Sequence, residues 1–155
     1  MEEKYINFLK KYDLYREDIF EYMKDRTKCV DYRLDESKRF YGVFTNIENG
    51  IIKDIRVMVP YIVDDTSISI RIHEYIHILK LYDYLNKEYV FTDYEDLLPV
   101  FYELVYAKEN NNYDYINERI DELKDNFNYL KVVLDLFDQN KENNNKKLIK
   151  NKKRK

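Results

Sequence analysis

The stretch RIHEYIHILK, residues 71–80, contains both histidines of the chain, His73 and His77, and places Glu74 directly after the first. Two histidines four residues apart lie on the same face of a helix, about one turn apart, so both imidazoles can reach one metal ion. Glu74 is rotated from them by about 100° around the helix axis, where it can accept a proton from a water molecule beside the metal. The stretch therefore predicts two metal ligands and a general base on one helix.

The residues around this stretch predict a helix from about 66 to 86. Apolar side chains recur there at helical spacing, at Ile72, Ile76 and Leu79. Three residues at its start can cap a helix N-terminus: Asp64, Asp65 and Thr66. A competing strand-like alternation is present at Ile68, Ile70 and Ile72. We expect the helix to prevail over this alternation.

A β-hairpin is predicted before the helix. The stretch RFYGVFTNIENGIIKDIRVMVPYIV, residues 39–63, is rich in β-branched and aromatic residues. Asn49-Gly50 separates two such runs, which is a strong hairpin signal. We therefore expect strands near 39–47 and 51–59, and Pro60 indicates an edge strand or a strand end.

Helices are predicted in the remaining parts of the chain. Residues 2–26 have helical spacing in two pieces, whereas 27–38 are polar and predicted to be irregular. A further helix is expected within 92–110, with Thr92 or Asp93 as its cap.

The last predicted helix covers about 113–139. Its apolar residues step alternately by four and three positions: Ile116, Ile120, Leu123, Phe127, Leu130, Leu134 and Phe137. Such a seam packs either on the core or on a partner helix, so dimerisation through the 116–137 helix stays open. Residues 1–140 are predicted to form a single domain, and 141–155 a basic, disordered tail.

Composition excludes several classes of protein. The 155 residues carry a net charge of −3, which argues against a general nucleic-acid binder. The lone Cys29 excludes an intrachain disulfide and a cysteine-based metal site. No apolar run reaches the length of a membrane span, and the N-terminus lacks a signal-peptide core. We therefore expect a cytoplasmic protein without a membrane partner.

The motif HEYIH, followed by a short connection and a helix with acidic residues in YEDLLPVFYELVYA, resembles the gluzincin class of zinc metallopeptidases. The chain is most similar to the oligopeptidase-like gluzincins, over roughly residues 50–108. The resemblance implies a zincin-like α+β core, mainly helical, and Zn²⁺ bound by His73, His77 and an acidic residue. It also implies an antiparallel edge strand beside the HEYIH helix, for which residues 51–63 are the candidate, and to which a peptide substrate can pair.

Two acidic residues compete for the third ligand position. In an antiparallel helix pair that turns near 88–90, Glu103 folds back opposite the two histidines, whereas Asp96 falls nearer the turn. The two acids are seven residues apart and share a helix face. In oligopeptidase-like families the earlier of two such acids binds the metal. We expect Glu103 to be the ligand, with Asp96 as the alternative or as the residue that orients a histidine.

The sequence thus predicts a small zinc-dependent metallopeptidase that cleaves a peptide or protein substrate. Glu74 is expected to be the general base, and Tyr106 is the preferred donor to a developing oxyanion, ahead of Tyr75 and Tyr102. Two alternatives remain open. One is a metal-binding pseudoenzyme or a helical protein-interaction module without catalysis. The other is a regulatory metallopeptidase-like protein of the kind that mobile elements encode.

Overall fold

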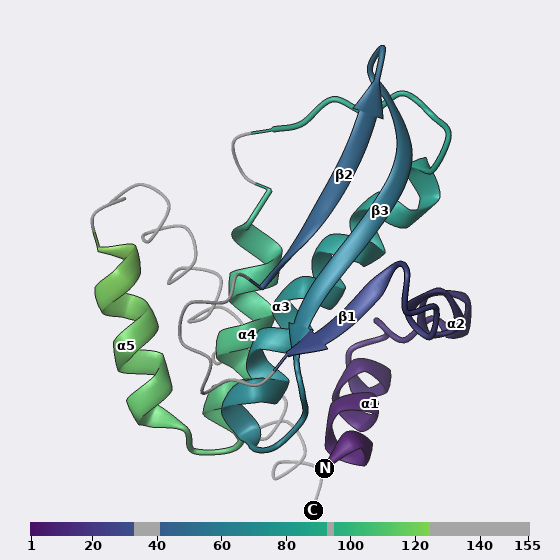
Figure 1. Ribbon diagram of the computed structural model, residues 1–155. Coiled ribbons are helices and arrows are strands. Elements are labelled where there is room, and N and C mark those ends of the chain that lie inside the picture. Colours follow the sequence, from purple (N-terminus) through teal and green to yellow (C-terminus); the bar gives the residue numbers. More distant parts are fainter. Residues whose placement is uncertain (33–40, 93–94, 125–155) are drawn as a thin grey trace, which may run out of the picture.

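The computed structural model describes residues 1–32, 41–92 and 95–124 (Figure 1). The predicted α+β class is confirmed, because a small mixed sheet packs against the central helix α3. The sheet has the order β1-β3-β2, with β1 at Cys29–Tyr32, β2 at Gly42–Glu48 and β3 at Ile51–Pro60. The described helices are α1 (Glu2–Lys11), α2 (Glu17–Met23), α3 (Asp65–Leu81), α4 (Leu97–Glu109) and α5 (Tyr113–Leu123).

The predicted hairpin is confirmed. β2 and β3 pair antiparallel and are joined by Asn49 and Gly50, whose φ angles of 54° and 77° are both positive. Asn and Gly tolerate this left-handed conformation, and its twist matches that of the flanking strands. The expected first residues of the hairpin, 39–40, lie outside the described residues.

The strand β1 was not predicted. Residues 27–38 were expected to be irregular, but Cys29–Tyr32 pair in parallel with the second half of β3, from Cys29↔Val57 to Tyr32↔Pro60. Parallel partners are far apart in sequence, so the turn and periodicity signals of a hairpin do not reveal them. Pro60 ends β3, in agreement with the sequence.

This pairing corrects the expected edge strand. β3 is the central strand, since β2 and β1 flank it on opposite sides. The outer strand on the side of α4 is β2 (Figure 1). Among the described residues no strand pairs with the outer edge of β2.

Helix α3 begins as the sequence predicts. Asp64 is its N-cap, and Oδ1 of Asp64 accepts a hydrogen bond of 2.8 Å from the backbone N–H of Ser67. The Ser67 hydroxyl oxygen accepts in return from the backbone N–H of Asp64, at 3.0 Å. This reciprocal capping satisfies two donors that the helix leaves unpaired.

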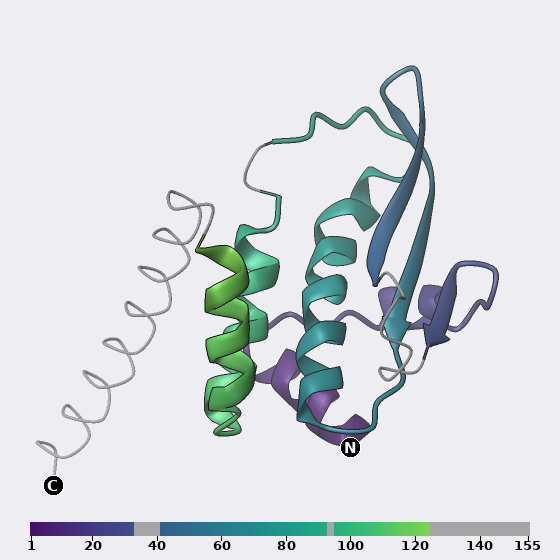
Figure 2. The ribbon, with the colours of Figure 1, turned by 60° about the vertical axis from the view of Figure 1, so that its left-hand side comes forward.

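Helix α3 lies between the sheet and α4 (Figure 2). Ile68 and Ile72 are fully buried in the main core, with β3 and the N-terminal helices. Ile70 packs instead against a second apolar cluster formed by α4 and α5. Because α3 buries opposite faces, its isoleucines need not follow a single stripe, which accounts for the strand-like alternation.

The connection after α3 differs from the expected short turn. The helix ends at Leu81 rather than near 86, and a 3₁₀ turn follows at Tyr82–Tyr84. Isolated bridges then join Leu85 and Glu88 to the first residues of β3. The chain thus runs along the sheet before α4 begins at Leu97.

The N-terminal helices α1 and α2 pack against the main core. The predicted division of residues 2–26 into two helices is confirmed. Tyr5, Leu9 and Ile19 are buried there. Tyr75 on α3 connects them to the motif, because its hydroxyl donates to the Leu14 carbonyl and accepts from the Arg16 N–H, both at 2.8 Å.

Helix α5 packs on α4. Ile116 is buried against α4 residues, with Ile120 and Leu123 at the margin of the same cluster. The described part of the predicted seam therefore packs inside the molecule. The remainder of the 116–137 seam, with its predicted dimer contact, and the predicted 141–155 tail lie outside the described residues. None of the described helices is long and apolar enough to cross a membrane.

Candidate metal centre

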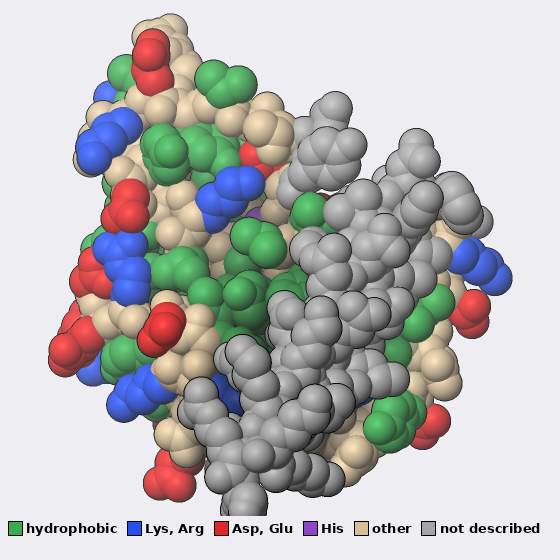
Figure 3. All heavy atoms as spheres, turned by 180° about the vertical axis from the view of Figure 1, so that it is seen from behind, with side chains coloured by type: hydrophobic (Ala, Val, Ile, Leu, Met, Phe, Trp, Pro, Cys, Tyr) green, Lys and Arg blue, Asp and Glu red, His purple; other side chains and the backbone are tan. Residues whose placement is uncertain are grey.

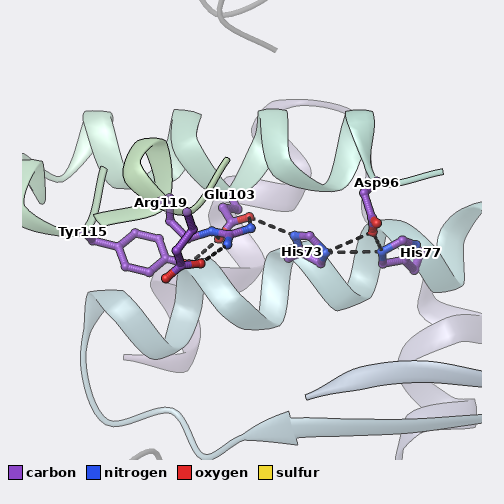
Figure 4. A network of polar contacts seen from close by, with 7 residues as sticks. His73, His77, Asp96, Glu103, Tyr115 and Arg119 are labelled. Atoms are coloured by element: carbon purple, nitrogen blue, oxygen red, sulfur yellow. Dashed lines mark hydrogen bonds and ion pairs between the residues drawn. The ribbon is translucent and has the colours of Figure 1, made fainter. Parts of the chain in front are cut away.

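Three side chains from α3 and the start of α4 converge on one point (Figure 4). Oδ1 of Asp96 lies 2.7 Å from Nε2 of His77 and 3.5 Å from Nε2 of His73. The two Nε2 atoms are 3.3 Å apart. The spacing of four residues thus brings both imidazoles to one side of α3, as the sequence predicts.

This triangle has the dimensions of a metal site. Nitrogen and oxygen ligands at 2.0–2.1 Å from a tetrahedral Zn²⁺ lie about 3.3 Å from one another. Two of the three separations, 3.3 and 3.5 Å, agree with this value, and the third, 2.7 Å, is a hydrogen-bond distance. Two imidazoles and one carboxylate are also a donor set that zinc accepts. The arrangement can therefore hold a divalent metal ion with a further position open.

Asp96 occupies the N-cap position of α4, but within the described residues its side chain makes no capping hydrogen bond. The carboxylate is directed at the histidines instead. The helix begins later than the sequence predicts, so Thr92 is not its cap, and Asp93 lies outside the described residues.

The geometry favours the reverse of the expected roles for the two acids. Glu103 was expected to face the metal, on the assumption of a helix pair turning near 88–90. Because the chain follows β3 before it enters α4, Asp96 reaches the two Nε2 atoms instead. Asp96 and Glu103 do lie on the same side of α4, the side towards α3, as their spacing of seven residues predicts.

Glu103 contacts the opposite nitrogen of His73. Its Oε1 lies 2.8 Å from Nδ1, so the carboxylate can accept the Nδ1–H hydrogen bond and leave Nε2 free for a ligand role. Glu103 is only 2% exposed. Such a buried charge needs partners, and α5 supplies two, Arg119 and Tyr115.

The electrostatics of the cluster follow from these contacts. Burial on its own lowers the pKa of His73, but hydrogen bonds to Asp96 and Glu103 outweigh it and raise that pKa to about 10. Hydrogen bonds from His73 and His77 hold the pKa of Asp96 far below its ordinary value. Without a metal, the site therefore binds a proton in its place.

Glu74 lies beside this cluster in a different environment. It is buried, and burial raises the pKa of its carboxyl group. Together with His73 and Tyr41 it lines a pocket of about 240 Å³ that also reaches Arg119 on α5. The side chain of His73 is 15% exposed and that of His77 is 17% exposed, and a small area of histidine reaches the surface in Figure 3. The side chain of Glu74 therefore borders a pocket that a small group can enter.

The tyrosines named from the sequence lie elsewhere. The hydroxyl of Tyr106 donates to Asp65 at the start of α3, two turns before His73 and thus about 12 Å from it along the helix axis. Tyr75 bonds the backbone of Leu14 and Arg16. The structure therefore does not bring the Tyr106 hydroxyl to the two histidines, and its expected oxyanion role stays a prediction.

Two residues of the site were missed, Tyr115 and Arg119. Both stand next to seam residues of α5, on the side that faces α4. A basic side chain beside an apolar seam is the signal that could have indicated a partner for a buried acid.

No protein family, curated protein or solved structure matches this chain. The resemblance to gluzincins therefore rests on the HEYIH motif and the acidic helix that follows it.

Proposed function

We propose that this protein is a zinc-dependent peptide hydrolase with a zincin-like core. The observation that carries the proposal is the convergence of His73 Nε2, His77 Nε2 and Asp96 Oδ1, together with the buried carboxyl group of Glu74, which lines a pocket with His73. A donor triad with a neighbouring carboxylate in a pocket is the constellation of metal-assisted hydrolysis.

Each residue has a distinct role in this proposal. A divalent zinc ion, when bound, polarises a substrate carbonyl and acidifies water. His73, His77 and Asp96 hold the ion, and Glu103 fixes the ring of His73 through Nδ1. Glu74 accepts the proton of the attacking water and delivers it to the leaving amine.

The sheet supports a peptide as the substrate. Tyr41 directly precedes β2 and lines the pocket together with His73 and Glu74. An extended peptide that pairs with the outer edge of β2 would therefore reach the pocket that His73 and Glu74 line. Within the described residues, β3 lies between β2 and β1, and β1 pairs with it from Val57 to Pro60.

Metal analysis tests the binding site. The purified protein should contain close to one zinc per chain, and His73→Ala and His77→Ala should each lose it. The control is Tyr75→Phe, a change on α3 whose hydroxyl contacts only the N-terminal segment among the described residues. A wild-type protein that takes up no zinc after supplementation would refute the proposal.

Hydrolysis of a quenched peptide library tests catalysis. Glu74→Gln should retain zinc and the fold but lose hydrolysis, because only the proton acceptor is removed. A zinc-loaded wild type without hydrolysis on any library would instead favour the metal-binding pseudoenzyme. Loss of zinc in Glu74→Gln would show that the roles are assigned wrongly.

A further inference from the structure

Two residues of helix α5 hydrogen-bond to Glu103 from the side opposite His73 (Figure 4). The Arg119 guanidinium donates from Nε to Oε2 at 3.0 Å and from Nη2 to Oε1 at 3.1 Å. The Tyr115 hydroxyl donates to Oε2 as well. Together with His73 Nδ1 on Oε1, four donors surround one carboxylate that is 2% exposed.

We propose that Arg119 and Tyr115 are positioning residues for the metal centre. The inference rests on the proposed function, because it concerns how the same site is prepared for its metal. The two parallel hydrogen bonds from Arg119 fix the plane of the Glu103 carboxylate, which a single donor leaves free to rotate. One acceptor position on Oε1 then remains, and Nδ1 of His73 hydrogen-bonds there. The ring of His73 is thereby held with Nε2 towards Asp96 and His77.

The attachment of α5 does not depend on these polar contacts alone. Ile116 and the ring of Tyr115 pack on Val100 and Leu104 of α4. Polar substitutions that keep this apolar contact should therefore leave α5 in place while they release Glu103. The guanidinium of Arg119 also has a second partner, Glu122, which is largely exposed.

The test measures zinc affinity by competition with a chelator, and the visible spectrum of the Co²⁺ form. Arg119→Gln should weaken zinc binding by about 10-fold, near the lower end of what changes behind a metal ligand cause. Arg119→Lys keeps the charge but not the paired hydrogen bonds, so it should restore only part of the affinity. Lys124→Gln, which removes one exposed positive charge from the C-cap residue of α5, is the matched control and should bind zinc like wild type.

Tyr115→Phe gives a second, independent variant that keeps the buried ring. It should weaken zinc binding several-fold and shift the Co²⁺ absorption bands in the same direction as Arg119→Gln. If the chain binds zinc through His73, His77 and Asp96, but Tyr115→Phe and any folded Arg119 variant stay within about twofold of wild type with unchanged spectra, the inference is wrong and the proposed function stands. If wild type binds no zinc or Co²⁺, both fail together.

Discussion

Oδ1 of Asp96 lies 2.7 Å from Nε2 of His77, while Oε1 of Glu103 lies 2.8 Å from Nδ1 of His73. Asp96, the N-cap residue of α4, thus contacts an Nε2 atom, whereas Glu103 within α4 contacts an Nδ1 atom. Only the first contact is at the point where both Nε2 atoms meet.

This difference predicts an order of metal affinities. Asp96→Ala should lower zinc affinity by more than 100-fold, because it removes a ligand, whereas Glu103→Gln should lower it by about 10- to 100-fold. A titration against a competing chelator measures both. A larger loss in Glu103→Gln would return the ligand role to Glu103, as expected from the sequence.

Zinc affinity should rise with pH. In the metal-free protein the pKa of His73 is raised from 6.5 to about 10, so its ring carries a proton that the metal must displace. Affinity should therefore increase by up to about tenfold per pH unit between about pH 6 and about pH 8. Calorimetry in two buffers of different ionisation enthalpy measures the released proton. Binding that releases no proton across this range would contradict the prediction.

The raised pKa of His73 has the opposite effect on the stability of the metal-free fold, which should fall as the pH rises. A raised pKa means that the native state binds the proton more tightly than the unfolded chain. The stabilisation is complete below pH 6.5 and is lost as the pH rises towards 10. Urea unfolding of the metal-free protein should show this decline. His73→Asn should flatten it.

Tyr75→Phe should destabilise the fold without affecting the metal. The substitution leaves the Leu14 carbonyl and the Arg16 N–H without their common partner, at a cost of about 1–3 kcal/mol in the free energy of unfolding. Denaturant unfolding measures this loss, and zinc affinity should stay at the wild-type value. A change in affinity would mean that the two faces of α3 are coupled.

Asp64→Ala should cost about 1 kcal/mol of stability, because it removes the acceptor that caps α3. Glu118→Ala, at an exposed position of α5, is a control that should change the unfolding free energy by less than about 0.5 kcal/mol. Equal effects of the two substitutions would show that the cap contributes nothing specific.

Local signals predicted the local structure. The turn at Asn49-Gly50 and the cap at Asp64 depend on neighbouring residues only, and both are confirmed. The two histidines are likewise fixed relative to each other by one helix. What the sequence did not reveal depends on contacts between distant segments.

The position of Asp96 illustrates this limit. It depends on where α4 begins, which depends in turn on the pairing of Leu85 and Glu88 with β3. The central place of β3 depends similarly on β1, a strand of only four residues. Neither pairing leaves a periodicity that a single sequence displays.

Of the three converging residues, Asp96 is far more exposed than the two histidines. His73 and His77 belong to a helix buried on opposite faces, whereas the side chain of Asp96 is 60% exposed. A metal ion at this point would cross-link the chain and close the segment between His77 and Asp96 into a loop. Opening that segment would require breaking a bond to the metal, so bound zinc would raise the free energy of local opening. Zinc should therefore slow amide hydrogen exchange in the first turn of α4 more than in the middle of α3.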